Sequence, residues 1–182
     1  FKIHNIGWNK NIINSKESYL DGYWQSYKYL NPIQNILLKE ITLKQSVENK
    51  CKEILDQILN TASVSIHIRR GDYVNDPKTK AAHYTFGLEY YIEAIKIINQ
   101  KISNPTFFVF SDDIGWVKQN LKIDFPTFFV SDPKIKDYEE LIIMSKCKNN
   151  IIANSSFSFW GAWLNQNKNK IVISPKKWNN KN

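Results

Sequence analysis

The chain has 182 residues, which is enough for one domain with a sizeable hydrophobic core. Its 25 lysines and arginines exceed its 17 acidic residues, and the formal net charge of +8 suits an anionic partner: a nucleotide, a nucleic acid or an acidic membrane surface. We expect no membrane-spanning segment, because no signal-peptide pattern and no long uncharged apolar run is present.

Helix-like and strand-like patterns alternate along the chain. In the first clear strand, Val64, Ile66 and Ile68 alternate with polar residues. In chain order, the expected elements are a short strand over Ser18–Trp24, a helical stretch over Tyr27–Ile41 interrupted by Pro32, a helix over Val47–Leu59, a strand over Val64–Ile68, a helix over Leu88–Asn99, a strand over Thr106–Phe110, a helix over Asp112–Leu121, a strand over Pro126–Val130, a helix over Asp137–Cys147, a strand over Ile151–Ile152, a helix over Ser156–Leu164 and a strand over Ile171–Ile173.

This alternation predicts an α/β fold, a Rossmann-like doubly wound parallel sheet covered by helices on both faces. Cys51 and Cys147 lie in apolar helical patterns without metal-ligand spacing, so we expect buried, reduced thiols. The chain begins at Phe1 in mid-pattern, and we expect it to be a fragment whose upstream part is missing.

Polar residues follow each predicted strand, and in doubly wound folds ligands bind at the carboxyl ends of the strands. These groups are Arg69–Tyr73, Ser111–Asp113, Ser131–Pro133 and Asn154–Phe157. Walker-type and dinucleotide-binding glycine motifs are absent from the sequence, so ordinary ATP and NAD sites are not indicated.

Strand geometry separates the two adjacent arginines. His67 and Arg69 share one face of the strand, whereas Arg70 points the other way. We therefore expect Arg69 to reach the ligand and Arg70 to pair with a carboxylate and brace the loop. A guanidinium offers two parallel donors and stays charged, which suits a diphosphate.

Ser155 and Ser156 precede a predicted helix, whose free backbone N–H groups suit phosphate. Together with Arg69 they would hold a pyrophosphate without a metal ion. For His67, a hydrogen-bonded structural histidine stays open beside a ligand contact. A different interpretation also stays open for four further residues, because Ser, Asp and Asn are favoured helix caps. These residues are Ser111, Asp112, Asn154 and Ser155.

Three ordered segments resemble the motifs of the α-1,2-fucosyltransferases, especially bacterial members. These are His67–Tyr73 (HIRRGDY), Phe108–Asp113 (FVFSDD) and Met144–Leu164, which contains NSSFSFWGAW; Tyr19–Ser26 upstream also matches. The resemblance implies the nucleotide-binding half of a GT-B-like enzyme. It assigns residues 1–60 to a connecting segment and the end of a partly missing acceptor-side half, and residues 61–182 to a Rossmann-like GDP-fucose-binding domain.

The resemblance also implies site roles. His67 would contact the nucleotide, Arg69 would grip the β-phosphate, and Ser156 with the Phe157 backbone would complete the phosphate site. Glu140 stands where relatives carry a shorter acid that recognises guanine. We place Arg69 and Asp72 in the catalytic set, with Asp72 either the base or an orienting partner of an arginine. The base itself is left unassigned, because Asp76 in the same loop and the missing half are further candidates. The remaining donor-site candidates are Arg70, Ser111, Asp112, Asn154 and Ser155.

The implied reaction transfers L-fucose from GDP-β-L-fucose to a galactose-type hydroxyl, with inversion and no metal or other cofactor, in surface polysaccharide, O-antigen or Lewis/H-type glycan synthesis. We expect a cytoplasmic enzyme that is peripheral at a bacterial inner membrane. The basic residues near the end of the chain are interpreted as a solvated surface, with contact to the membrane as the alternative; they are Lys168, Lys170, Lys176, Lys177 and Lys181. One rival is a non-catalytic nucleotide-sugar-binding domain. A nucleic-acid-binding protein is the other, but the basic residues are spread along the chain and form no recognition motif.

Overall fold

A computed structural model describes residues 8–13, 26–44, 47–82 and 84–178. The chain divides into two compact units, residues 1–44 and residues 45–182. The first unit contains α1 (Lys10–Ile13), α2 (Tyr27–Leu30), the 3-10 helix η1 (Asn31–Ile33) and α3 (Gln34–Glu40). The predicted helical stretch with an interruption at Pro32 is confirmed, because Pro32 lies in η1 between the two helices. The predicted strand Ser18–Trp24 lies outside the described residues.

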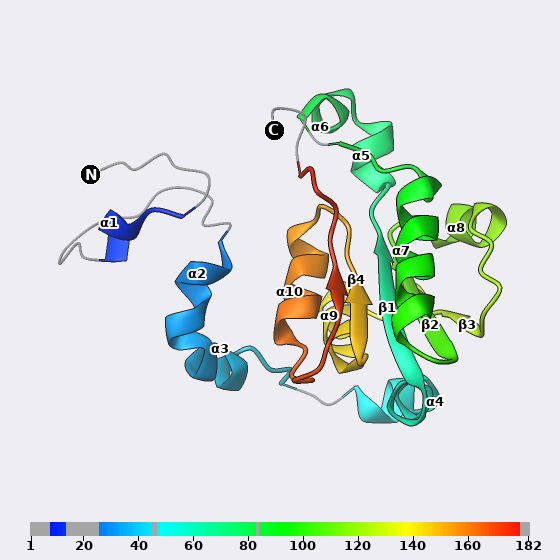
Figure 1. Ribbon diagram of the computed structural model, residues 1–182, viewed down its shortest axis with the longest axis horizontal. Coiled ribbons are helices and arrows are strands. Elements are labelled where there is room, and N and C mark those ends of the chain that lie inside the picture. Colours follow the sequence, from blue (N-terminus) through cyan, green and yellow to red (C-terminus); the bar gives the residue numbers. More distant parts are fainter. Residues whose placement is uncertain (1–7, 14–25, 45–46, 83, 179–182) are drawn as a thin grey trace. The chain divides into compact units, whose positions relative to one another are not determined.

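The second unit alternates strands and helices. Its elements are α4 (Glu48–Asn60), β1 (Ala62–Ile68), α5 (Gly71–Asn75), α6 (Pro77–Ala82), α7 (Leu88–Lys101), β2 (Pro105–Ser111), α8 (Ile114–Asn120), β3 (Thr127–Phe129), α9 (Asp137–Lys146), β4 (Asn149–Ile151), α10 (Ser156–Leu164) and β5 (Val172–Ile173). Figure 1 shows α5 and α6 beyond the carboxyl end of β1, and α4 at the opposite end of the sheet.

The five strands form one parallel sheet in the order β3-β2-β1-β4-β5. The predicted doubly wound α/β fold is confirmed. From the central strand β1 the chain builds outward through β2 and β3, then crosses back to β4 and β5 on the other side. The strand order therefore reverses between β1 and β4, and in this class of fold ligands bind at the carboxyl side of such a reversal.

Each face of the sheet has its own layer of helices. On one face, Val64, Ile66 and Ile68 of β1 pack with buried residues of α7 and α8. Period two places Ser63, Ser65 and His67 on the opposite face, which α9 and α10 cover (Figure 1). That face buries polar groups by pairing them: the Asn150 amide donates to Ser65 Oγ at 2.7 Å.

Several element boundaries differ from the sequence predictions, most clearly those of β4 and α8. Strand β4 begins at Asn149 rather than Ile151, because the Asn150 side chain finds buried partners and so tolerates a strand position. Helix α8 begins at Ile114, because Asp113 is its N-cap and accepts the Trp116 N–H at 3.3 Å. The short helices α5 and α6 were not predicted at all.

Both cysteines are buried and free, as predicted. Helix α4 belongs to the second compact unit. The assignment of residues 1–60 to the end of an acceptor-side half stays a prediction. Within the described ranges, no helix is long and apolar enough to cross a membrane.

Candidate functional site

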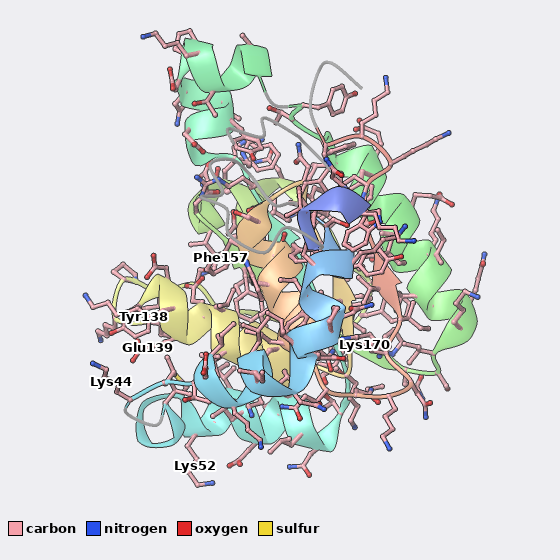
Figure 2. The ribbon with its side chains drawn as sticks, turned by 90° about the vertical axis from the view of Figure 1, so that its left-hand side faces the viewer. Lys44, Lys52, Tyr138, Glu139, Phe157 and Lys170 are labelled. Atoms are coloured by element: carbon pink, nitrogen blue, oxygen red, sulfur yellow. The ribbon has the colours of Figure 1, made fainter. Side chains whose placement is uncertain are left out.

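Two turns meet at the point where the strand order reverses. One follows β1 and leads into α5, and the other follows β4 and leads into α10. The buried Tyr73 of α5 joins them, because its hydroxyl donates to the Asn154 carbonyl at 3.1 Å. His67, at the end of β1, packs on Phe157 in the first turn of α10, with ring centroids 5.2 Å apart. Figure 2 labels Phe157 at this end of α10.

Arg69 lies at the end of the central strand between two carboxylates. Its Nη2 is 2.7 Å from Asp72 Oδ1, and its Nη1 is 3.0 Å from Asp112 Oδ2. The guanidinium also lies over the Tyr73 ring, 5.6 Å from the centroid. One third of the side chain is exposed, and a guanidinium has five N–H donors. Arg69 can therefore keep both aspartates and still bind an incoming anion.

Arg70 points elsewhere and is held by a different set of groups. Its Nε is 3.3 Å from Asp113 Oδ2, and its guanidinium stacks on Trp116 at 3.3 Å from the ring centroid. Its side chain is only 18% exposed. This is the geometry of a residue that braces the β1–α5 turn against α8.

Asp112 holds the same turn from the end of β2. One carboxylate oxygen accepts the Arg70 backbone N–H at 2.9 Å, while the other pairs with Arg69. A Cβ at Gly71 would lie 2.5 Å from Asp112 Oδ2, closer than real contacts allow. Glycine at this position therefore lets the carboxylate approach the turn. Because Asp113 caps α8, Asp112 stays available for this role.

His67 is buried and neutral. Burial first, and the nearby Arg69 charge second, lower the pKa of its imidazole to about 3. Its Nδ1 is a buried polar atom with no hydrogen-bond partner among the described residues. Buried polar atoms are almost always paired in folded proteins, so an orphan beside a helix start points to a group supplied by a ligand.

The β4–α10 turn leaves helix N–H groups available. Ser155 occupies the N-cap position, but among the described residues its side chain makes no capping hydrogen bond. Ser156 is exposed at the first position of the helix. Asn154 acts differently, because its amide donates at 2.8 Å to the carbonyls of Tyr84 and Trp178 and so ties three segments together.

Glu140 lies further along the same sheet edge. Its Oε2 accepts a hydrogen bond from Ser131 Oγ at 3.0 Å, and Ser131 Oγ in turn accepts the Ser111 N–H at 2.9 Å. Ser111 Oγ accepts the Asp113 N–H at 3.0 Å. Burial is the main cause that raises the pKa of Glu140 to about 7, and Asp137 adds to it.

Two sets of contacts therefore lie side by side at the carboxyl edge of the sheet. Hydrogen bonds lead from Glu140 through Ser131 to Ser111, and the next residue in the chain, Asp112, pairs with Arg69. The sequence placed Tyr73, Asp113 and Ser131 in the polar groups that follow predicted strands, but it indicated no individual role for them and did not single out Trp116.

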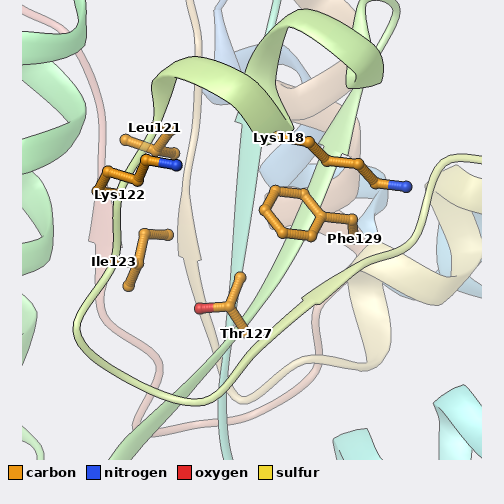
Figure 3. Close-up of a pocket in the computed structure, with 6 residues that line it drawn as sticks. All are labelled: Lys118, Leu121, Lys122, Ile123, Thr127 and Phe129. Atoms are coloured by element: carbon orange, nitrogen blue, oxygen red, sulfur yellow. The ribbon is translucent and has the colours of Figure 1, made fainter.

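Other features of the second unit lie apart from this edge. A hollow of about 200 Å³ opens beside the edge strand β3, lined by Lys118, Leu121, Lys122, Ile123, Thr127 and Phe129 (Figure 3). None of the candidate site residues lines it.

Lys170 donates to the carbonyls of Ala162 and Asn165 at the end of α10, so this lysine caps a helix. Lys181 lies outside the described residues. Within the described ranges, no cluster of three or more His, Cys, Asp or Glu side chains is arranged to hold a metal ion.

Comparison with known proteins identifies the family. The sequence profile described as Glycosyl transferase family 11 matches residues 8–182. The chain belongs to this family. The resemblance to α-1,2-fucosyltransferases that the three motifs indicated is therefore confirmed.

Two relatives of this family 11 chain come from Escherichia coli. The O-antigen biosynthesis glycosyltransferase WbnK is 36% identical over 87% of the chain and 54% of its own length. An alpha-1,2-colitosyltransferase is 38% identical over 86% of the chain and 54% of its own length. A galactoside 2-alpha-L-fucosyltransferase of Bos taurus is 24% identical over 80% of the chain and 41% of its own length. The chain thus spans about half the length of the curated relatives it matches.

A solved structure of POFUT1 in complex with GDP resembles this chain with a TM-score of 0.48 and 16% sequence identity. The match covers 72% of this chain and 46% of that one.

Proposed function

We propose that this family 11 chain forms the donor-binding part of an inverting glycosyltransferase. The enzyme transfers L-fucose from GDP-β-L-fucose to a galactose-type hydroxyl of a glycan, in α-1,2 linkage and without a metal ion. Family membership and the names of the relatives support the reaction class. The observation that carries the proposal is the placement of Arg69 and the first turn of α10 on the two sides of the strand-order reversal.

The donor diphosphate binds between these two groups in the proposal. Arg69 contributes a charged guanidinium with two parallel N–H donors, and the first turn of α10 contributes backbone N–H groups and the positive end of its dipole. Ser156 adds an exposed hydroxyl. The neutral His67 satisfies its Nδ1 with a hydrogen bond from or to the nucleotide. These groups supply the positive charge that a metal ion provides in other transferases.

Transfer breaks the bond between the anomeric carbon and the β-phosphate oxygen while the acceptor oxygen forms a new bond on the opposite face. GDP leaves with the electron pair, so negative charge grows on the β-phosphate. Arg69 and the α10 start neutralise that charge in preorganised positions, which is an effective form of transition-state stabilisation. Removing one such donor costs about 10²–10³ in rate.

The acceptor proton needs a base, and Asp72 has two candidate roles. Its ion pair with Arg69, with 2.7 Å between Oδ1 and Nη2, favours a positioning role, because the guanidinium already engages that carboxylate oxygen. An Asp72→Asn variant separates the roles. Loss of kcat with unchanged GDP affinity identifies the base, whereas weaker GDP binding identifies the partner that orients Arg69.

A second donor is favoured by one observation, the 38% identity to an alpha-1,2-colitosyltransferase. Colitose lacks the 3-hydroxyl group of fucose but has the same configuration at its other carbon centres, so one donor site can accommodate either sugar. The test offers GDP-fucose and GDP-colitose to the natural protein that carries this chain, with galactose-ended acceptors and EDTA. Transfer of fucose to the 2-hydroxyl group supports the proposal. Transfer of colitose alone corrects the donor. GDP binding without transfer of either sugar, by a demonstrably folded protein, establishes the non-catalytic rival.

The proposal includes a biological setting. The name of the WbnK relative refers to O-antigen biosynthesis, which supports a glycan acceptor of the surface-polysaccharide class. We place the reaction at the cytoplasmic face of a bacterial inner membrane, where sugar nucleotides meet lipid-linked acceptors. Flotation of the protein with vesicles of anionic lipid tests peripheral membrane contact.

A further inference from the structure

The family resemblance assigns guanine recognition to Glu140, and we infer that Ser131 is the positioning residue that orients this carboxylate toward the two adjacent N–H donors of the base. The inference rests on the proposed function and deepens it, because it names the residue that sets base selectivity. Ser131 lies between β3 and α9, and its position alone, after a strand, does not reveal this role.

The hydrogen bonds fix the direction of the Ser131 hydroxyl. Its oxygen accepts the Ser111 N–H at 2.9 Å, and Ser111 is the last residue of β2. A hydroxyl has one proton to donate, and here Glu140 Oε2 lies 3.0 Å away to accept it. The carboxylate is thereby anchored through one oxygen to the end of β2.

This anchoring leaves acceptor capacity on Glu140. Each carboxylate oxygen has two lone pairs, and the Ser131 hydroxyl and the Asp132 backbone N–H use only part of that capacity, so the carboxylate can accept further donors. Guanine presents N1–H and its 2-amino group side by side, and both match an ionised carboxylate. Adenine presents one donor beside one acceptor on the corresponding edge, and uracil presents one donor between two carbonyls. An ionised, correctly oriented Glu140 therefore discriminates by hydrogen-bond pattern.

Ser131 also supports the ionised form. Burial and Asp137 raise the pKa of Glu140, whereas the Ser131 hydroxyl and the Asp132 backbone N–H oppose them. These are the groups acting on Glu140 from its own helix and from the preceding loop. Without Ser131 the carboxyl group holds its proton to a higher pH, and a protonated carboxyl presents a donor that the guanine edge does not accept.

The test compares Ser131→Ala with the parent chain by calorimetric titration of GDP and IDP, on both sides of the Glu140 pKa of about 7. IDP lacks the 2-amino group. We expect GDP affinity at neutral pH to fall about tenfold in Ser131→Ala, the range for a hydrogen bond to a charged group. We also expect the preference for GDP over IDP to shrink, and the acid-side loss of GDP affinity to move to higher pH.

Two variants act as controls. Ser131→Thr keeps the hydroxyl and restores the preference for GDP. Ser145→Ala removes another serine of the same unit, one that donates to the Ile142 carbonyl at 2.7 Å, and leaves GDP affinity within about twofold. Circular dichroism confirms that each variant is folded.

The outcomes separate this inference from the proposed function. A folded parent chain that prefers neither GDP nor any other nucleotide contradicts the proposed function. A parent chain that prefers GDP, with Ser131→Ala unchanged in affinity, preference and pH profile, overturns the inference alone. Equal weakening of GDP and IDP at every pH also overturns it, because that result indicates a merely structural serine.

Discussion

Asp112, just beyond the end of β2, holds Arg69, just beyond the end of β1, with 3.0 Å between Oδ2 and Nη1. Its second oxygen accepts the Arg70 backbone N–H at 2.9 Å. One carboxylate therefore fixes both the guanidinium that we assign to the diphosphate and the turn that carries it. The approach of Asp112 to this turn requires glycine at position 71, because a Cβ there would lie 2.5 Å from Asp112 Oδ2.

This relationship predicts a coupling between Gly71 and Asp112. Gly71→Ala overpacks the turn and is expected to lower the free energy of unfolding by about 1–3 kcal/mol. In an Asp112→Ala background the same change meets no carboxylate and costs less than about 1 kcal/mol. Urea denaturation of the two single variants and the double variant measures the coupling. Additive effects would show that Asp112 does not approach Gly71 as described.

Substitution of Arg70, unlike that of Arg69, should lower the stability of the chain without weakening GDP binding. Arg70→Ala removes the stacking on Trp116 and the contact with Asp113, and is expected to cost about 1–2 kcal/mol of stability. Because Arg70 does not face the proposed diphosphate site, GDP affinity of the folded variant stays close to that of the parent. Thermal melts and GDP titrations give the two readouts. Loss of GDP binding by folded Arg70→Ala would place the second arginine in the site.

Glu140 should make stability depend on pH. Its pKa is 4.5 ordinarily and about 7 in the folded chain, so folding favours the protonated form. The resulting stabilisation is fully present below pH 4.5 and is lost as pH rises through about 7. Glu140→Gln keeps a neutral side chain at every pH. It should be more stable than the parent above pH 7 and similar to it near pH 4.5, while GDP affinity falls.

Denaturant titrations at the two ends of this pH range measure the effect. A parent chain whose stability relative to Glu140→Gln does not change with pH would mean that the carboxyl group titrates normally.

His67 should make stability depend on pH in the opposite direction to Glu140. Its pKa falls from 6.5 to about 3 on folding, so its contribution to stability is full above pH 6.5 and is lost as pH falls toward 3. His67→Phe cannot take up a proton and keeps an aromatic ring against Phe157. It should resist acid better than the parent and bind GDP about threefold to tenfold more weakly, the range for one neutral hydrogen bond.

Acid unfolding and calorimetry check these two effects of His67→Phe. Undiminished GDP affinity would show that Nδ1 does not meet the nucleotide.

Much of the fold follows from sequence pattern. Alternating strand and helix periods predict the parallel sheet, and parallel connectivity brings the strand ends to one edge, so Arg69, Asp112 and Ser156 were identified as candidates from the chain alone. Glu140 entered through the family resemblance. Period two also predicts that Arg69 and Arg70 diverge, and their contacts with separate carboxylates fit that expectation.

The remaining features depend on distances between strands, which local periodicity does not encode. Nothing in the sequence indicates that the Asn154 amide serves two distant carbonyls, Tyr84 and Trp178. The polar start of β4 was missed because Asn150 is satisfied only by a neighbouring strand and helix. Ser131 contacts the Ser111 N–H at the end of the neighbouring strand β2 and a carboxylate on the helix that follows it, and neither contact is visible in the local pattern.

The most direct test of the account is calorimetric titration of the chain and of folded Arg69→Ala with GDP in EDTA, with ADP and UDP as comparisons. The account predicts GDP binding by the parent without metal, much weaker binding of ADP and UDP, and a loss of affinity of about tenfold or more in Arg69→Ala. Equal GDP affinity in the parent and in Arg69→Ala would contradict the assignment of Arg69 to the diphosphate.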